Sequence, residues 1–150
     1  MDEAIRLAKE NVTSGLGGPF GAVIVKDGKI IGRGVNRVTT NNDPTAHAEV
    51  IAIRDACKNI QSFQLENCEV YTTCEPCPMC LGAIYWARPE KVYYASTQFD
   101  AAAINFDDSF IYLEIEKNID QRSIKFIPFM REEAQDVFYL WQNAQNKIEY

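Results

Sequence analysis

This sequence of 150 residues has only one histidine, His47, and no long apolar run. A membrane-spanning helix needs about 20 consecutive apolar residues, and no stretch approaches that length. Residues 1–7 mix charged and apolar side chains, so they lack the continuous apolar core of a signal peptide. We find no repeat, low-complexity tract or linker. With 47% apolar residues, the chain can bury a sizeable core, and we expect one domain over residues 1–150 without a membrane partner.

Basic residues are also scarce. The sequence has 15 Lys and Arg residues against 21 Asp and Glu residues, which gives a net charge of −6. Contacts from Lys and Arg to phosphate supply most of the non-specific affinity of a protein for a polynucleotide. We therefore do not expect nucleic acid as a partner, although a local basic groove is compatible with this overall charge.

Cysteine is present in an odd number that does not suggest disulfides. The paired framework of a small secreted protein is missing, so a reducing cytoplasm is the expected location. The five cysteines are Cys57, Cys68, Cys74, Cys77 and Cys80.

Apolar and turn-forming segments alternate in an order that predicts a three-layer α/β/α domain. Apolar residues near helical spacing give a first helix that ends near Ser14. Asp27-Gly28 suits the tight turn of a hairpin between two β-rich runs. Asp43-Pro44 is a good helix start, with Asp as N-cap and Pro at the first helical position. The next predicted elements are strands 20–25 and 29–35, a helix from 43 to about 58, a strand at 69–73, a helix from 77 to 87 and a strand at 91–95.

The C-terminal third is expected to add two helices and a strand. Residues 107–115 and 131–147 are predicted to be helical, and residues 124–129 to form a short strand. Parallel strands need crossover helices that return over the sheet. A hairpin followed by alternating strands and helices therefore implies a mixed sheet that is covered on both faces.

His47 and the pair Cys77 and Cys80 have the composition of a metal site. A Cys-x-x-Cys pair at a helix start can supply two corners of a tetrahedron and an imidazole the third, which leaves the fourth corner for water. Positions two apart lie about 200° around a helix, so His47 and Glu49 can serve one site only from an opening turn. The sequence therefore predicts that two helix N-termini converge, where their partial positive charge favours thiolates.

Other chemistries use similar residues. A Cys-x-x-Cys pair also occurs in redox sites, and Cys74, Cys77 and Cys80 resemble part of an iron–sulfur ligand run that lacks a nearby fourth cysteine. If Cys74 were a fourth zinc ligand, the site would be closed and purely structural. We instead expect Cys74, like Cys57 and Cys68, to pack as a small buried side chain.

The combination of residues 46–49, Ala-His-Ala-Glu, with residues 76–80, Pro-Cys-Pro-Met-Cys, resembles the zinc-binding signature of the cytidine deaminase superfamily. The likeness runs through nearly the whole chain and is greatest to the bacterial guanine deaminase family. It implies the superfamily fold, a three-layer α/β/α domain with a five-stranded mixed sheet. It also implies Zn²⁺ as cofactor and hydrolysis of guanine at C2 to xanthine and ammonia. The matching segments are residues 18–25, 42–49, 74–88 and 106–112.

The same resemblance implies how the reaction is catalysed. His47, Cys77 and Cys80 would bind zinc, which lowers the pKa of a water at the open position. Glu49 would accept the water proton, pass it to the ring and protonate the departing ammonia. Asp108 matches a second acid that shuttles protons. From the residues alone, Asp108 would instead be a helix-start residue.

Five residues would contact the substrate, a small purine base. Asn36 would hydrogen-bond the base, Phe20 and Trp86 would line the pocket, and the backbone N–H of Ala48 would touch the substrate. The family also exchanges C-terminal segments within a homodimer, so that Tyr150 would close the pocket of the partner subunit. Judged without the resemblance, Asn36 is a loop cap, Phe20 and Trp86 are core aromatics, and the terminus is disordered.

Several alternatives share the metal motif. The zinc chemistry does not specify the ring, so guanosine, cytosine or adenosine in tRNA could be the substrate. The negative charge and the acidic segment 107–110 argue against tRNA. The alternative to an enzyme is a structural zinc-binding module that has no catalytic activity.

Overall fold

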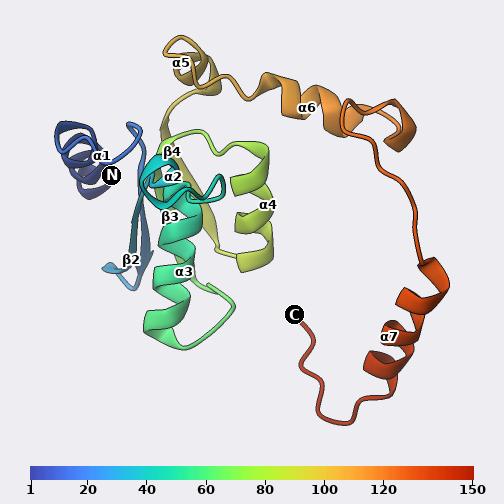
Figure 1. The fold of residues 1–150 in the computed structure, drawn as a ribbon. Coiled ribbons are helices and arrows are strands. Elements are labelled where there is room, and N and C mark those ends of the chain that lie inside the picture. Colours follow the sequence, from blue (N-terminus) through green and yellow to red (C-terminus); the bar gives the residue numbers. More distant parts are fainter. The chain divides into compact units, whose positions relative to one another are not determined.

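A four-stranded mixed sheet organises the first two-thirds of the chain (Figure 1). The computed structural model describes residues 1–150, which fall into two compact units, Met1–Phe110 and Ile111–Tyr150. The sheet has the strand order β2-β1-β3-β4 and belongs to the first unit. No helix has both the length and the apolar character needed to cross a bilayer.

The strands lie where the sequence predicts them as far as Ser96. β1 (Gly21–Lys26) runs antiparallel to both β2 (Lys29–Val35) and β3 (Cys68–Cys74). β3 pairs in parallel with β4 (Lys91–Ser96), which forms one edge of the sheet. The turn between β1 and β2 has positive φ angles of 50° and 73° at residues 27 and 28, as expected for an Asp-Gly hairpin.

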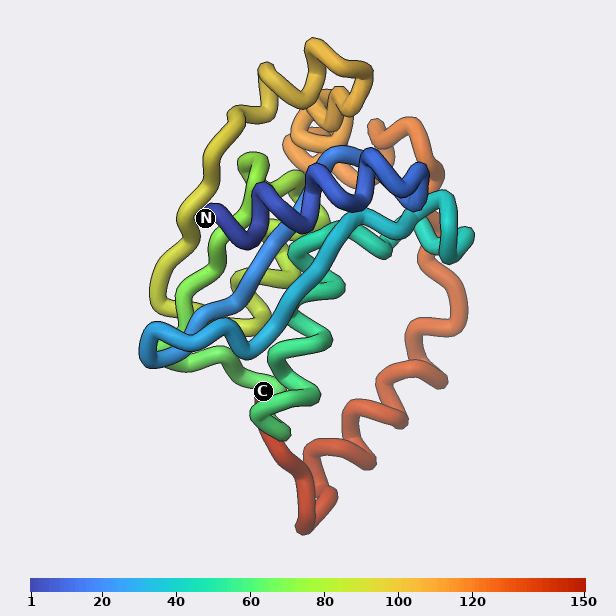
Figure 2. The backbone as a smooth tube through the Cα atoms, turned by 90° about the vertical axis from the view of Figure 1, so that its left-hand side faces the viewer, coloured from blue at the N-terminus to red at the C-terminus, as the bar shows by residue number.

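Two glycines show that helices cover both faces of the sheet. A Cβ on Gly21 would overlap a backbone oxygen of α1 (Asp2–Thr13), and a Cβ on Gly34 would overlap one of α3 (Ala48–Ile60). Gly21 pairs with Val35, the neighbour of Gly34, so the two glycines point to opposite faces. The β1–β2 hairpin therefore lies between α1 and α3 (Figure 2).

The second helical layer is completed by α4 (Pro78–Ala87), the crossover between parallel strands β3 and β4. Ala87 at its end packs into the core on the α3 face. The predicted three-layer α/β arrangement is thereby confirmed. The buried core cluster consists of Ala22, Ile24, Ala48, Ala52, Ala56, Leu65, Cys68, Val70 and Ala87.

The first turn of α3 differs from the prediction. The helix begins at Ala48 with His47 as its N-cap, not at Asp43-Pro44. Asp43 stabilises a separate turn instead, because its Oδ1 accepts hydrogen bonds from the backbone N–H and the hydroxyl of Thr45, at 2.8 and 2.7 Å. Asp43 therefore caps the turn that precedes α3 and not the helix itself.

Two short helices lie outside the predicted elements. α2 (Val38–Asn41) occupies the segment expected to be a loop, and α5 (Gln98–Ala102) follows β4. α5 begins with a reciprocal capping box, in which Thr97 and Asp100 each accept a hydrogen bond from the backbone N–H of the other.

Helices and irregular backbone make up the C-terminal residues. α6 (Ser109–Glu116) crosses the boundary between the units and is followed by a 3₁₀ turn, Ile119–Gln121, and by α7 (Arg131–Asn143). α6 and α7 confirm the two predicted helices, although α7 ends four residues early. No residue of the second unit is buried.

The predicted strand at residues 124–129 is wrong, and the sheet of the chain has four strands instead of five. A strand needs a neighbour that supplies hydrogen bonds, and these residues pair with no strand. Pro128 also lacks a backbone N–H. The apolar side chains of this segment remain exposed to solvent, since Ile124, Ile127 and Phe129 are 74%, 78% and 83% exposed.

Candidate metal centre

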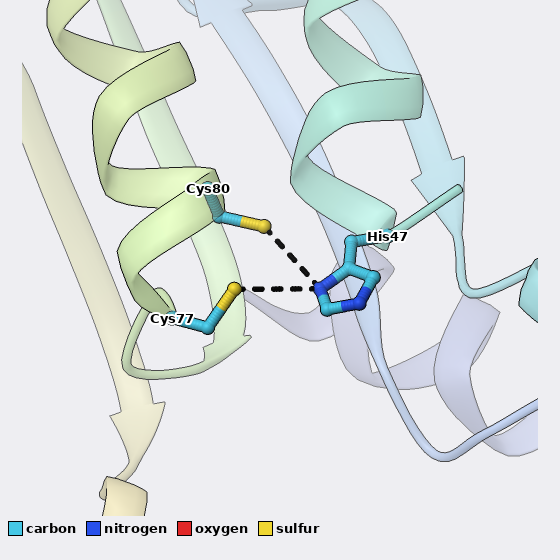
Figure 3. A group of neighbouring side chains, drawn as sticks. All are labelled: His47, Cys77 and Cys80. Atoms are coloured by element: carbon cyan, nitrogen blue, oxygen red, sulfur yellow. Dashed lines mark hydrogen bonds between the residues drawn. The ribbon is translucent and has the colours of Figure 1, made fainter. Parts of the chain in front are cut away.

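His47, Cys77 and Cys80 meet at the first turns of α3 and α4 (Figure 3). His47 is the N-cap of α3 and Cys77 the N-cap of α4, both with extended backbone. Pro78 takes the first helical position of α4, where its missing N–H is harmless. The two helix N-termini converge as predicted, although they are 30 residues apart in the sequence.

The separations of the three ligand atoms suit a tetrahedral ion. Sγ of Cys77 and Sγ of Cys80 each lie 3.5 Å from Nδ1 of His47, and all three atoms lie within 4.8 Å of one another (Figure 3). Typical zinc bond lengths place a ligand nitrogen and sulfur about 3.6 Å apart in a tetrahedron. Cys80 is buried, whereas His47 and Cys77 are only partly buried, so the cluster has an open side.

The charges of these ligands also favour a cation. A hydrogen bond from the Cys80 thiol, together with nearby His47, lowers the pKa of Cys77 to about 4. The Cys77 sulfur and burial raise the pKa of Cys80, and Cys77 also raises the pKa of His47. The Cys77 thiol therefore ionises readily, whereas ionisation of Cys80 is opposed by the negative charge on the Cys77 sulfur. A divalent cation would remove that repulsion, so the donor set fits a metal ion.

Glu49 brings a buried carboxylate to the cluster. It is 6% exposed, and its Oε2 lies 3.4 Å from the Cys80 Sγ, which donates to it. Its Oε1 accepts a hydrogen bond from the Thr72 hydroxyl at 3.0 Å. Burial raises the pKa of Glu49. A carboxyl group with a raised pKa can both take and return a proton near neutral pH.

Asp108 and Asp107 have different environments. Burial, with the Cys77 sulfur nearby, raises the pKa of Asp108, and its charge contributes to raising the pKa of His47. Asp108 is therefore electrostatically coupled to the cluster. Asp107 is exposed, and its Oδ1 accepts a hydrogen bond from the backbone N–H of Ser109 at 2.9 Å. Asp107 supports the start of α6.

Two long hydrogen bonds from the backbone orient the amide of Asn36. Its Oδ1 accepts hydrogen bonds from the backbone N–H groups of Gly18 and Val38, each at 3.4 Å, which leaves Nδ2 as its available donor group. Asn11 on α1 holds the surrounding backbone, because its Nδ2 donates to the carbonyls of Asn36 and Gly18, both at 2.9 Å. Asn36 and Asn11 are both buried.

Phe20 lies against the same loop. Its ring packs edge to face with Phe106, with centroids 5.0 Å apart. A Cβ on Gly18 would lie 3.3 Å from the Phe106 ring, so these aromatic rings flank the Asn36 region. Ala48 is fully buried as the first residue of α3, and its N–H precedes the first helical hydrogen bond, from Ile51 to His47.

Trp86 and Tyr150 are not brought to the cluster within the first unit. Trp86 is 63% exposed near the end of α4, roughly 12 Å along the helix axis from Pro78. Tyr150 belongs to the second unit.

Cys74 is a buried thiol beside the cluster. Its Sγ donates to the carbonyl of Thr97 at 3.5 Å, and burial raises the pKa of Cys74 to about 11. It is not part of the group of three possible ligands, in agreement with the expected packing role. All five cysteines are free thiols.

Sequence reasoning missed Thr72, Asn11 and Phe106. A weak signal exists for Thr72, because Val70, Thr72 and Cys74 form one buried row of β3 and only Thr72 has a hydroxyl to satisfy. Asn11 is similarly a buried polar residue on an amphipathic helix. Glu49, the partner of Thr72, and Asn36, one partner of Asn11, lie 23 and 25 residues away in the sequence and could not be found from local pattern.

The fold and the cluster define the class of protein. Residues 1–96 match the family model of the cytidine and deoxycytidylate deaminase zinc-binding region, and the chain belongs to this family. Within it, the chain is 59% identical over 150 residues to the guanine deaminase of Bacillus subtilis (strain 168), a match that covers 100% of this chain and 96% of that protein.

Two further comparisons show that one relative resembles nearly the whole chain and another resembles only part of it. The X-ray structure of Bacillus subtilis guanine deaminase superimposes with a TM-score of 0.96 at 59% identity, over 99% of this chain and 95% of that one. The tRNA-specific adenosine deaminase of Haemophilus influenzae is 45% identical over 96 residues, 60% of this chain and 56% of that protein. The likeness to the tRNA enzyme thus covers only part of each chain.

Proposed function

We propose that the chain is a zinc-dependent aminohydrolase that converts guanine and water to xanthine and ammonia. The observation that carries this proposal is the similarity to the Bacillus subtilis guanine deaminase, which extends over the whole chain. The match to the tRNA-specific adenosine deaminase is partial, and the net charge of −6 disfavours a polyanionic substrate.

His47, Cys77 and Cys80 are the proposed zinc ligands. Their separations and their paired sulfurs support this assignment. A bound Zn²⁺ would supply a water of lowered pKa at the open side of the cluster. Cys74 would stay outside the ligand set, so that the fourth position remains free for water.

Glu49 is proposed to move the protons of the reaction. Its Oε2 faces the cluster beside Cys80, where it can accept a proton from the attacking water. The oxygen of that water bonds to C2 of guanine, and the carboxyl group passes the proton to the ring. The carboxylate then takes the proton of the new C2 hydroxyl and gives it to the exocyclic amine as the bond from C2 to that nitrogen breaks, which releases ammonia and leaves the carbonyl group of xanthine.

Asp108 is the proposed second acid. C2 lies between two ring nitrogens, so a second acid beside Glu49 can assist both the protonation of the ring and the departure of the amine. Asp108 is coupled to His47 and Cys77, and its raised pKa suits a proton donor. The neighbouring Asp107 is already engaged by Ser109.

Three residues of the first unit are proposed to bind the base. Nδ2 of Asn36 would donate to an acceptor on the purine edge, because its Oδ1 is engaged by backbone N–H groups. Phe20 would offer a ring face to the planar base. Ala48 would contribute its backbone N–H, which no helical carbonyl accepts.

We further propose that the chain forms a homodimer in which the C-terminal segment serves the partner. Residues 111–150 have no buried side chain of their own, and α7 exposes Phe138, Leu140 and Trp141 by 72%, 73% and 47%. Such surfaces are typical of contacts with another chain. Tyr150 would then close the pocket of the partner subunit. Trp86, at the far end of α4 from its own cluster, would line a pocket through the same dimer.

A cytoplasmic location is part of the proposal. The free thiols at the cluster need a reducing compartment to remain available to a metal. Fractionation of cells that express the tagged chain should recover it with cytoplasmic marker enzymes.

Release of ammonia from a substrate panel tests the function. The panel contains guanine, guanosine, adenine, cytosine, cytidine and tRNA. Guanine should give the highest kcat/KM. A higher value for any other member would reassign the substrate, and zinc-loaded protein that acts on none of them would support a non-catalytic zinc module.

A further inference from the structure

The Thr72 side chain occupies a core position that an apolar residue would normally fill. Along β3 the buried side chains alternate, and the row on the α3 side contains Cys68, Val70, Thr72 and Cys74. Thr72 is 1% exposed. A buried hydroxyl without a partner is costly, so a threonine at this position needs a specific acceptor.

That acceptor is the Glu49 carboxylate. Thr72 Oγ1 donates to Glu49 Oε1 at 3.0 Å, and both side chains are buried. The opposite oxygen, Oε2, lies 3.4 Å from Cys80 Sγ. The hydroxyl and the cluster thus engage different oxygens of one carboxylate, which fixes its rotation about the bond to the side chain.

We infer that Thr72 is a positioning residue for the deamination reaction, which holds Glu49 so that Oε2 faces the metal cluster and the water proton. This inference rests on the proposed function of the site. The Thr72 side chain forms its hydrogen bond with Glu49 and none with the three possible metal ligands. It acts only through Glu49.

The positioning role has a chemical basis in proton transfer. A general base must lie within hydrogen-bond reach of the proton that it accepts, and small displacements of a catalytic group lower the rate steeply. Without the Thr72 hydroxyl, the Glu49 carboxylate would lose the contact that holds its Oε1. Binding of the base, by contrast, depends on groups that Thr72 does not contact, so kcat should change more than KM.

Three substitutions separate positioning from packing. Thr72→Val keeps the shape and removes the hydroxyl, whereas Thr72→Ser keeps the hydroxyl and removes a methyl group. Thr73→Val is the matched control on the same strand, since Thr73 Oγ1 accepts a hydrogen bond from the Gly21 N–H at 3.1 Å, away from Glu49. If Thr72→Val does not fold, Thr72→Ala takes its place in the comparison with Thr72→Ser.

Steady-state kinetics of the zinc-loaded chain with guanine should show a kcat about 10- to 100-fold lower for Thr72→Val. KM and zinc content should stay within about twofold, and Thr72→Ser and Thr73→Val should keep kcat within about threefold. An unchanged kcat for Thr72→Val, or an equal loss for Thr72→Ser, would overturn the inference. If another base is the substrate, the same ratios are measured with that base.

Thermal unfolding of the zinc-loaded chain provides a test that does not need turnover. Thr72→Val should lower Tm by about 2–4 °C in the unmodified chain and by less than about 1 °C when Glu49 is replaced by Ala, because the hydroxyl has then lost its partner. Equal shifts in both backgrounds would overturn the inference. If the chain deaminates nothing, the proposed function fails, and this cycle alone decides whether Thr72 holds Glu49.

Discussion

Oε2 of the Glu49 carboxylate lies 3.4 Å from Sγ of Cys80. The contact joins the first turn of α3 to the first turn of α4, and it sets the proposed proton carrier directly beside a proposed zinc ligand. A water held at the open side of the cluster would therefore have a proton acceptor within reach.

Glu49→Gln is expected to abolish most turnover without loss of zinc. The amide keeps the shape of the side chain but cannot accept and return a proton, so kcat with guanine should fall about 10²- to 10⁴-fold. Metal analysis should still find about one zinc per chain, since the three ligands are intact. Glu66→Gln, at an exposed position, is the control and should retain activity. A comparable kcat for Glu49→Gln and the unmodified chain would remove Glu49 from the mechanism.

Asp108→Asn should reduce kcat strongly, by about 10²-fold or more, with little loss of zinc. Asp107→Asn is the matched control, because it removes the neighbouring charge and weakens only the contact to Ser109 at the start of α6. Kinetics of the two variants should therefore differ by at least an order of magnitude. If both variants turn over guanine at near-normal rates, Asp108 has no part in proton transfer.

Asn36→Asp tests the donor that is proposed to bind the base. The carboxylate can still accept from Gly18 and Val38, but the Nδ2 donor is gone, so kcat/KM for guanine should fall at least about 10-fold. Asn41→Asp on α2 adds the same charge at an exposed position and should leave kcat/KM unchanged. An equal effect of both substitutions would show that the charge matters and not the donor.

A mixture of two defective chains tests whether Tyr150 acts on the partner. A chain without Tyr150 has an intact cluster, and a Glu49→Gln chain has an intact tail; each alone should have low activity. Co-expression should restore about a quarter of the normal activity, since half of the randomly formed dimers contain one complete site. Mixed dimers that recover no activity would exclude a tail that closes the partner subunit's pocket.

Much of the first unit could be predicted because local chemistry determines it. The Asp27-Gly28 turn fixes the hairpin, and Pro78 marks the start of α4. His47 and Glu49 are two residues apart and could serve one site only from an opening turn, and both do lie in the first turn of α3, although that helix begins at Ala48 and not at Asp43-Pro44.

Other features depend on contacts that no local pattern contains. Asp43 binds Thr45 and so does not cap α3. The acceptor of Thr72 lies 23 residues earlier in the chain, on a different element. For residues 124–129, an apolar β-rich pattern predicted a strand, but a strand forms only where a neighbour pairs with it, and the chain offers none there.

Removal and restoration of the metal test whether the deamination of guanine depends on zinc. The purified chain should contain about one zinc, and a strong chelator should abolish the formation of xanthine from guanine. Addition of about one equivalent of Zn²⁺ should restore it, whereas a Cys77→Ala chain should not respond. Undiminished turnover of guanine by the zinc-free chain, or no turnover by the zinc-loaded chain, would contradict a zinc-dependent guanine deaminase.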